Sequence, residues 1–273
     1  MSCPLIGIAG LCLHRKRKFI VTTIKQRLAR GESVRVFLIG AIPNHKIIEV
    51  VSLAGNYQGV WVDQEHSAVP HQQLEVLMLA CRSAQLDAFV RVPPTDYGTI
   101  MRPMEAGANG IMAAQIRTVD QVQQVVQWAK YPPVGVRGMF RANYEAGFGT
   151  RDPSEIAETS NRDRWLAIQI ETPEAVDCVD EIAAIDEVDS LFVGPGDLSV
   201  TLGVPGQPMH PKCIAALERV SAAVKAAGKS WGVLPFSREH AAKCRELGCQ
   251  LFSIGSDMEL IRRGLQATET MFG

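Results

Sequence analysis

The sequence predicts an α/β protein built as a (β/α)8 TIM barrel, and three observations support this fold. Short apolar runs of strand type alternate with longer segments of helical periodicity from residue 23 onward, as in parallel βαβ units. The strand-like runs number eight. Ionisable residues recur directly after several of them. A doubly wound sheet with insertions has a similar alternation, but only a closed barrel gathers the downstream ends of so many strands on one face.

Each predicted strand is a run of four to six consecutive residues, and together the runs are rich in Val, Ile, Leu and Phe. Helical segments between them have the apolar spacing of helices that pack one face on a sheet. Gly107, Gly228 and Gly248 each stand shortly before a strand, where a helix C-terminal cap is expected. The strands are 34–39, 59–62, 88–92, 110–113, 165–170, 190–193, 230–234 and 251–254, and the clearest helices are 71–84, 119–128 and 213–227.

Composition limits the classes of function. The 273 residues are 47% hydrophobic and 21% charged, which is typical of a globular protein with a large core. A net charge of -1 and a pI near 6.6 lack the basic footprint of a nucleic-acid or membrane-surface protein, so we expect a small-molecule partner. The seven cysteines form no CxxC pair, which favours free thiols in a reducing, cytoplasmic setting.

The amino terminus is unlike the rest of the chain. Residues 3–13 are apolar and residues 14–18 are mostly basic, which is the reverse of the order in a secretory signal. The apolar stretch is also too short to cross a bilayer. We therefore expect residues 1–22 to be a poorly ordered extension and residues 23–273 to form a single barrel domain.

Two carboxylates follow apolar strands and suit a metal site. Glu171 comes directly after the fifth predicted strand, and Asp197 follows the sixth. Two carboxylates with water in the open positions suit Mg²⁺, with Mn²⁺ or Co²⁺ as substitutes. The competing interpretation is that each carboxylate caps the helix that follows it.

The second and third strands supply further candidates. Asp63 and His66 follow the second strand. The ordinary pKa of a histidine lies near neutrality, so a histidine beside a carboxylate suits acid–base chemistry. Arg91 lies in an otherwise apolar strand, where a guanidinium needs an anionic partner. That partner is either a structural carboxylate such as Asp63 or a substrate oxyanion.

A glycine-containing segment, residues 194–199, follows the sixth strand. Its free backbone N–H groups could cradle an anion, but it lacks the Lys-Ser/Thr of a nucleotide-binding loop. In this setting the amides could instead receive a carboxylate beside the metal.

Several of these segments together resemble the HpcH/HpaI family of metal-dependent class II pyruvate aldolases, which includes 4-hydroxy-2-oxoheptanedioate aldolase. The resemblance runs from about residue 23 to the C-terminus, and the order and spacing of the motifs are specific. The motifs are Asp63-Gln64-Glu65-His66, Val90-Arg91-Val92-Pro93, Met104-Glu105-Ala106-Gly107-Ala108, residues 131–138, Gln169-Ile170-Glu171-Thr172 and Gly194-Pro195-Gly196-Asp197-Leu198-Ser199.

The resemblance implies a phosphoenolpyruvate/pyruvate-type barrel that cleaves a 4-hydroxy-2-oxo acid into pyruvate and an aldehyde. Glu171 and Asp197 would be the metal ligands, Arg91 would face the keto oxygen, and amides near Gly196, Asp197 and Leu234 would receive the carboxylate. Gln169 would line the substrate site. His66, paired with Glu105 and oriented by Asp63, would act as general base through water.

Alternatives stay open on the sequence. Oxaloacetate decarboxylation passes through the same enolate, and a silent keto-acid-binding member would keep the fold. The loop 139–149 departs from the family and could contact the aldehyde, or its Phe140 and Tyr144 could pack on the surface. Family members are commonly hexameric, so the resemblance implies a homo-oligomer, a hexamer or trimer, with residues 256–272 as the packing helix.

Overall fold

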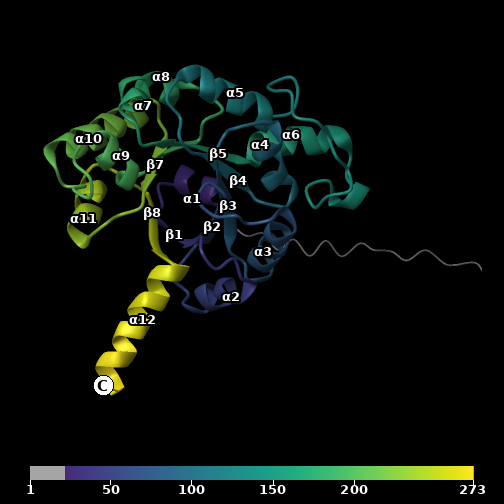
Figure 1. Cartoon of the computed structure of the whole chain (residues 1–273). Coiled ribbons are helices and arrows are strands. Elements are labelled where there is room, and N and C mark those ends of the chain that lie inside the picture. Colours follow the sequence, from purple (N-terminus) through teal and green to yellow (C-terminus); the bar gives the residue numbers. More distant parts are fainter. Residues whose placement is uncertain (1–21, 273) are drawn as a thin grey trace, which may run out of the picture.

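Eight parallel strands close into a barrel in the order of the sequence, β1-β2-β3-β4-β5-β6-β7-β8 (Figure 1). The computed structural model describes residues 22–272, so the predicted extension over residues 1–22 lies almost entirely outside the described residues. The predicted TIM barrel is confirmed. The strands are β1 (Val34–Ile39), β2 (Gly59–Asp63), β3 (Asp87–Val92), β4 (Gly110–Ala113), β5 (Trp165–Ile170), β6 (Ser190–Val193), β7 (Ser230–Val233) and β8 (Leu251–Ser256).

Most helices surround the barrel on its outside, whereas α1 (Ile24–Ala29) lies across one end of the barrel and packs on its interior side chains (Figure 1). The inward faces of the surrounding helices and the outward side chains of the strands form one large core. The helices are α1 (Ile24–Ala29), α2 (His45–Leu53), α3 (His71–Ser83), α4 (Tyr97–Glu105), α5 (Val119–Ala129), α6 (Pro153–Asp163), α7 (Pro173–Asp177), α8 (Val179–Ala184), α9 (Pro195–Thr201), α10 (Pro211–Ala226), α11 (Arg238–Glu246) and α12 (Asp257–Phe272).

The strands are apolar runs because both faces of the sheet are buried. Every residue of β2 through β7 is buried, as expected for a parallel sheet covered by helices outside and filled by side chains inside. The barrel interior contains an aromatic layer in which the Trp61 and Phe89 rings stack at 6.1 Å and the Phe89 and Trp165 rings meet at 4.8 Å.

The predicted boundaries agree with the structure to within one or two residues. Gly107, Gly228 and Gly248 have φ of +107°, +66° and +82°, so each supplies the left-handed residue that ends a helix. β7 stops at Val233, which leaves Leu234 in the loop, and β8 continues to Ser256.

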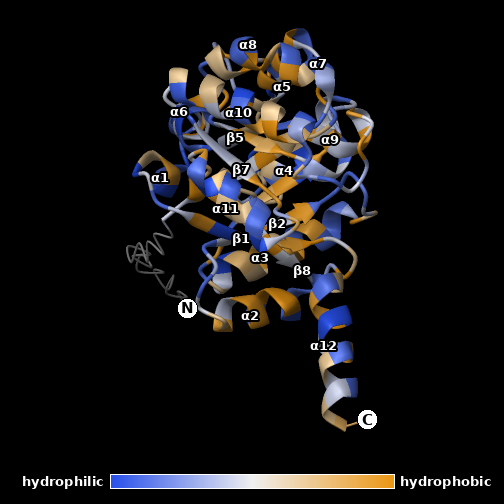
Figure 2. Ribbon diagram, turned by 90° about the vertical axis from the view of Figure 1, so that its left-hand side faces the viewer, coloured by the Kyte–Doolittle hydropathy of each residue, from blue (hydrophilic) through white to orange (hydrophobic). Residues whose placement is uncertain are grey.

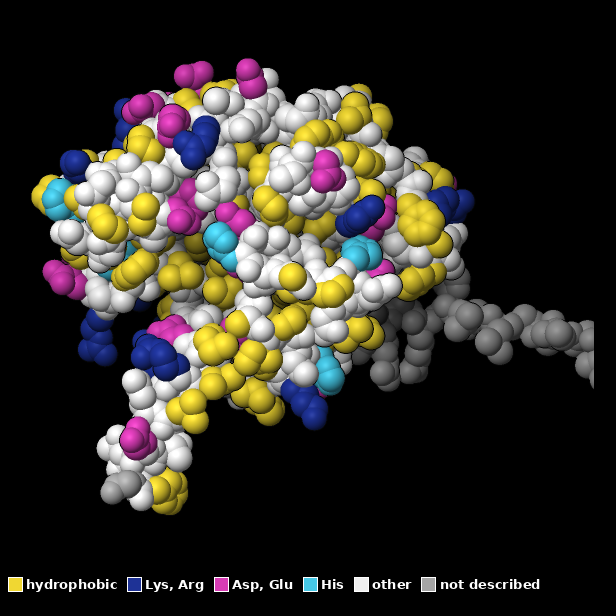
Figure 3. Space-filling model, viewed as in Figure 1, with side chains coloured by type: hydrophobic (Ala, Val, Ile, Leu, Met, Phe, Trp, Pro, Cys, Tyr) yellow, Lys and Arg dark blue, Asp and Glu magenta, His cyan; other side chains and the backbone are white. Residues whose placement is uncertain are grey.

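The carboxyl-terminal helix α12 departs from the barrel. It projects from the body of the molecule (Figures 1 and 2), and Asp257 anchors its start by accepting hydrogen bonds from the amides of Gly40 (2.9 Å) and Ile42 (2.7 Å). Hydrophobic side chains gather on the surface around the base of α12 and over α2 (Figure 3). Between residues 22 and 272, no helix combines the length and apolarity needed to span a membrane.

Candidate active site

The predicted site residues lie where the strands of the barrel end. Asp63 is the last residue of β2, Arg91 lies in β3, Glu171 follows β5, Asp197 is the third residue of α9 after β6, and Leu234 follows β7. Side chains two apart on a strand share a face. Asp63 and Arg91 therefore point inward like the aromatic residues two positions earlier. The polar groups form a layer above the aromatic floor, at the carboxyl end of the barrel.

Arg91 is held by two carboxylates. The register of β2 and β3 places Asp63 opposite Arg91, and Arg91 donates through Nε to Oδ1 (3.0 Å) and through Nη2 to Oδ2 (2.7 Å) of Asp63. Arg91 Nη1 also lies 3.1 Å from Glu65 Oε2. The guanidinium carbon stands 5.1 Å from the centre of the Trp61 ring. The predicted need of Arg91 for an anionic partner is thus met within the protein.

These contacts keep both partners ionised. Burial by itself raises the pKa of Asp63, but the hydrogen bonds and positive charge of Arg91 outweigh it, so the pKa of Asp63 is below its ordinary value. Burial likewise opposes the charge on Arg91, yet Asp63, Glu65 and Glu171 together raise the pKa of Arg91. The cluster therefore presents a fixed cation at the carboxyl ends of β2 and β3.

Glu171 is fully buried beside that cation. Its Oε1 accepts from the backbone amide of Gln115 (2.8 Å), and its Oε2 accepts from Nε2 of Gln169. Burial raises the pKa of Glu171 to about 7, and the negative charges of Glu65 and Asp197 add to this against the opposing effects of the Gln115 amide and Arg91. Glu171 and Asp197 are thus close enough to repel each other.

The donor set fits a hard divalent cation. Two neighbouring carboxylates offer oxygen ligands, and a cation between them would relieve their repulsion. Gln169 Oε1, a buried acceptor nearby, has no hydrogen-bond partner, and Glu65 Oε2 has its ion pair with Arg91. Gly194 leaves the space that the Glu171 carboxylate occupies, because a Cβ there would lie 2.5 Å from Glu171 Oε2. Residues 22–272 contain no group of three or more His, Cys, Asp or Glu able to hold a metal.

His66 and Glu105 are not joined by a hydrogen bond or ion pair in the described part of the chain. His66 has a largely exposed side chain, and its Nε2 lies 3.8 Å from Oε2 of Glu65. Glu105 is the last residue of α4, a helix antiparallel to the strands, so it lies towards the amino end of the barrel. Burial raises the pKa of Glu105. The predicted pairing of His66 with Glu105 remains a prediction.

Glu105 lines a second surface feature, a cavity of about 600 Å³ beside α3. The loop 139–149 forms its other wall, where Phe140, Tyr144 and Phe148 expose their rings, and the Arg82 guanidinium lies 3.8 Å from the Tyr144 ring centre. The aromatic residues of this loop therefore lie on the outer surface, beside the helices.

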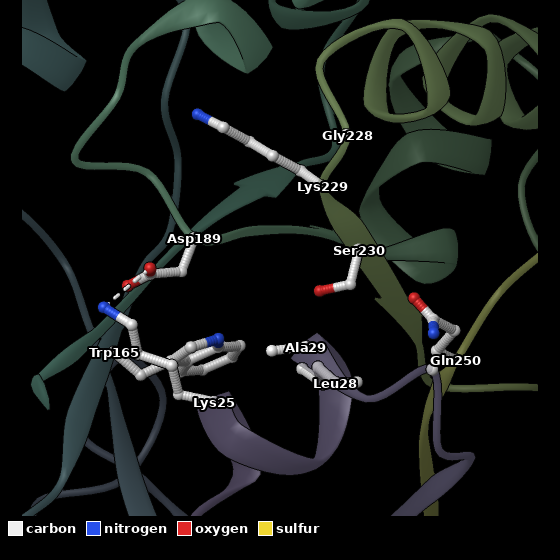
Figure 4. Close-up of a pocket in the computed structure, with 10 residues that line it drawn as sticks. Lys25, Leu28, Ala29, Trp165, Asp189, Gly228, Lys229, Ser230 and Gln250 are labelled. Atoms are coloured by element: carbon white, nitrogen blue, oxygen red, sulfur yellow. Dashed lines mark ion pairs between the residues drawn. The ribbon is translucent and has the colours of Figure 1, made fainter.

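Another cavity, of about 420 Å³, opens at the amino end of the barrel, opposite the predicted site (Figure 4). It is lined by α1 and by the first residues of β5 and β7, Trp165 and Ser230. Lys25 and Asp189 form an ion pair of 2.8 Å across its edge. None of the predicted site residues lines this cavity, so it is separate from the site at the strand ends.

The structure adds two residues to the candidate site. In the sequence, Glu65 stands out only as part of the motif Asp63-Gln64-Glu65-His66. Its contact with Arg91 depends on how the loop after β2 folds back. Gln115 acts through its backbone, and its φ of +55° is uncommon for a residue other than glycine. Its position two residues after the end of β4 is the signal that the sequence offers, since strand ends face the site.

Comparisons with known proteins agree with this geometry. The model of the HpcH/HpaI aldolase/citrate lyase family matches residues 35–264. A protein of Rhizobium etli named pyruvate aldolase is 33% identical over 254 residues, 92% of this chain and 98% of the relative. A Salmonella arizonae protein named 4-hydroxy-2-oxo-heptane-1,7-dioate aldolase is 31% identical over 232 residues, 85% of this chain and 88% of the relative.

The solved structures include a similar barrel. An HpcH/HpaI aldolase/citrate lyase family protein from Burkholderia cenocepacia J2315 superposes with a TM-score of 0.84 at 31% identity, and the match covers 91% of this chain and 98% of that one. Sequence, fold and relatives thus point the same way: this protein is a carbon–carbon lyase and belongs to the HpcH/HpaI aldolase/citrate lyase family.

Proposed function

We propose that the protein reversibly cleaves a 4-hydroxy-2-oxo acid into pyruvate and an aldehyde, with a divalent cation at Glu171 and Asp197. The observation that supports this most is the buried Glu171, whose raised pKa marks a carboxylate in need of a cation, facing the fixed guanidinium of Arg91. Mg²⁺ suits the oxygen ligands best, and Mn²⁺ or Co²⁺ can replace it. No lysine is required, because the reaction uses no Schiff base.

The cleavage step needs a base and a site for negative charge. The base, His66 in our proposal, removes the proton from the 4-hydroxyl group, the C4–O electrons form the aldehyde carbonyl, and the C3–C4 bond breaks. The electron pair of that bond moves to the keto oxygen at C2 to give the enolate. Arg91 stabilises this oxyanion through its free N–H groups. A proton returned to C3 completes pyruvate.

The remaining residues orient the substrate. The amides of Gly196, Asp197 and Leu234 lie at the strand ends beside the carboxylates and are proposed to receive the pyruvate carboxylate. Gln169 holds Glu171 in place through Nε2, and its Oε1 has a free acceptor position. When bound, the cation supplies positive charge at the keto oxygen that complements Arg91.

Pyruvate release tests this proposal. Chelator-treated protein is assayed with a panel of 4-hydroxy-2-oxo acids, with and without Mg²⁺, Mn²⁺ or Co²⁺. We expect metal-dependent cleavage that Glu171→Ala abolishes. Glu174→Ala is the matched control, because Glu174 is a nearby exposed carboxylate that pairs with Arg117 on the surface. Metal-independent cleavage, or full activity in Glu171→Ala, would contradict the proposal.

Oxaloacetate belongs in the same panel. Its decarboxylation gives the same enolate, so the residues named above would serve that reaction as well. Turnover of oxaloacetate alone would favour a decarboxylase, and metal binding without any turnover would favour a silent keto-acid-binding protein.

The acidic partner of His66 is Glu105 by the family resemblance, whereas the geometry of the chain favours Glu65. Glu65 Oε2 lies 3.8 Å from His66 Nε2, and Glu105 has no bond to it. If Glu105 is the partner, as the family resemblance implies, Glu105→Gln shifts the acidic limb of the kcat/KM profile and Glu65→Gln does not. The reverse result assigns the role to Glu65.

We further propose a homo-oligomer, a hexamer or trimer, in which α12 packs on a neighbouring copy. The helix is amphipathic, and Met258, Ile261 and Leu265 expose one side of it without any cover from the barrel. Leu265→Asp is expected to reduce the mass measured by light scattering, whereas Gln266→Asp, the neighbouring exposed polar position, keeps it. Equal masses for both variants and wild type would contradict the role of α12.

A further inference from the structure

An exposed phenylalanine stands at the carboxyl end of β7. Leu234 is half-buried against the barrel interior, whereas Phe236 exposes 52% of its surface. The Phe236 ring extends to the start of α9, because a Cβ added to Gly196 would meet Phe236 Cζ at 3.8 Å. The ring therefore borders the backbone of residues 196–197, the same backbone that is proposed to receive the pyruvate carboxylate.

A buried histidine holds this segment. His240, in the first turn of α11, has no exposed surface, and its Nδ1 accepts a hydrogen bond of 3.3 Å from the amide of Phe236. Its own amide donates to Oγ of Ser237, the N-cap of α11, at 3.0 Å. Because Nδ1 offers its lone pair to Phe236, the proton of the neutral ring lies on Nε2. Nε2 is buried without a partner.

No charged group compensates for the burial of His240. Its neighbours on α11, Arg238 and Glu239, are exposed, and no ionised side chain of any other described element contributes to its titration. Burial alone lowers the pKa of His240. The neutral ring is thus the form that the fold accommodates.

We propose that Phe236 covers the carboxylate end of the substrate site and that His240 is the positioning residue that keeps Phe236 there. This rests on the proposed function, in which pyruvate binds at residues 196–197. An apolar ring over that end keeps water away from the carboxylate, which strengthens its bonds to the amides. It also limits the room beside the carboxylate, which favours a small 2-oxo acid.

The same contact makes substrate binding depend on pH. A proton on Nδ1 of His240 would face the N–H of Phe236, so two donors would oppose each other and the segment would be released. At saturating Mg²⁺, the Kd for pyruvate is therefore expected to rise more steeply on acidification in the wild type than in a variant without the imidazole, because protonation of Glu171 affects both proteins alike.

Pyruvate binding to the metal-loaded protein, measured by calorimetry, tests the proposal. His240→Leu keeps apolar volume but removes the acceptor, and we expect about fivefold weaker binding, the effect of one hydrogen bond. His240→Asn places an acceptor near the Nδ1 position and should restore binding to within about twofold. Phe236→Ala should weaken binding by about fivefold or more.

A double-mutant cycle shows whether His240 acts through Phe236. The double variant, His240→Leu with Phe236→Ala, should bind pyruvate as Phe236→Ala does. The Kd for Mg²⁺ should stay at the wild-type value in each variant. In turnover assays, each of these variants should raise KM more than it lowers kcat.

The outcomes separate the two proposals. If the wild-type protein neither binds nor releases pyruvate, the proposed function fails and this inference fails with it. If the wild type binds pyruvate and Phe236→Ala or His240→Leu binds equally well, or if the two effects add in the double variant, only the inference is overturned. Phe236 is exposed, so the Kd for pyruvate of the wild type and of Phe236→Ala, compared across the same pH range, decides the matter even if His240→Leu does not fold.

Discussion

Gly194→Ala tests whether Glu171 is held where a metal ligand must be. The new Cβ would lie 2.5 Å from Oε2 of Glu171 and 2.6 Å from Nε2 of Gln169, both well inside ordinary contact distance. The backbone conformation itself allows alanine, with φ of -92°. Steric contact alone therefore pushes the Glu171 carboxylate by about 1 Å, a displacement that can lower kcat/KM about 100-fold.

Metal titration and pyruvate release together measure this effect. We expect the affinity for Mg²⁺ to fall by about 10- to 100-fold, as when the groups that orient a metal ligand are disturbed. Gly196→Ala is the matched control for metal affinity, since its methyl group would meet only the Phe236 ring at 3.8 Å. A folded Gly194→Ala protein with wild-type metal affinity and turnover would refute the assignment of Glu171 as a ligand.

Three further predictions concern the buried charges. Glu171→Gln should raise the Tm of the metal-free protein at pH 8 but not at pH 5. The pKa of Glu171 is raised from 4.5 to about 7 in the folded protein, so the stability that the neutral acid gives at low pH is lost as the pH rises through 7. In urea unfolding, Arg91→Met should cost about 3–5 kcal/mol because it leaves the buried Asp63 carboxylate without its cation, and adding Asp63→Asn should recover part of that loss. Burial opposes the charge of Glu145, but Arg164 and Arg137 outweigh it and lower the pKa of Glu145 to about 2. The ionised carboxylate therefore stabilises the fold above pH 4.5, and this stability is lost as the pH falls towards 2. Glu145→Gln should lower the Tm at pH 7, and the difference in Tm from the wild type should shrink near pH 2.

The strands could be predicted because other parts of the protein bury both faces of most of them. A strand buried on both faces is mostly apolar, so β4, β5 and β6 begin and end at the predicted residues, and so does β1, in which only Arg35 is exposed. The ends of β7 and β8 differ by one or two residues because the last residues of a strand pair with their neighbours according to barrel closure, which hydropathy does not encode. Closure in sequence order also explains why polar residues far apart in sequence could be predicted to share one end.

Contacts between side chains could be predicted from the sequence less well than the strands. The sequence left open whether the partner of Arg91 is a structural carboxylate such as Asp63 or a substrate oxyanion, and the β2–β3 register pairs it with Asp63. Glu65 joined the cluster because the loop after β2 turns back over the strand. The position of Glu105 at the end of α4 depends on the length of that helix, and no motif reveals it.

The sequence by itself determined the barrel and the end of the barrel that carries Asp63, Arg91, Glu171 and Asp197, because hydrophobic periodicity and strand ends are local properties of the chain. The tertiary structure alone decided which groups touch: the hold of two acids on Arg91, the raised pKa of Glu171, the projection of α12 and the bond between His240 and Phe236. Each of these depends on burial and on distances between distant segments, which exist only once the barrel has closed.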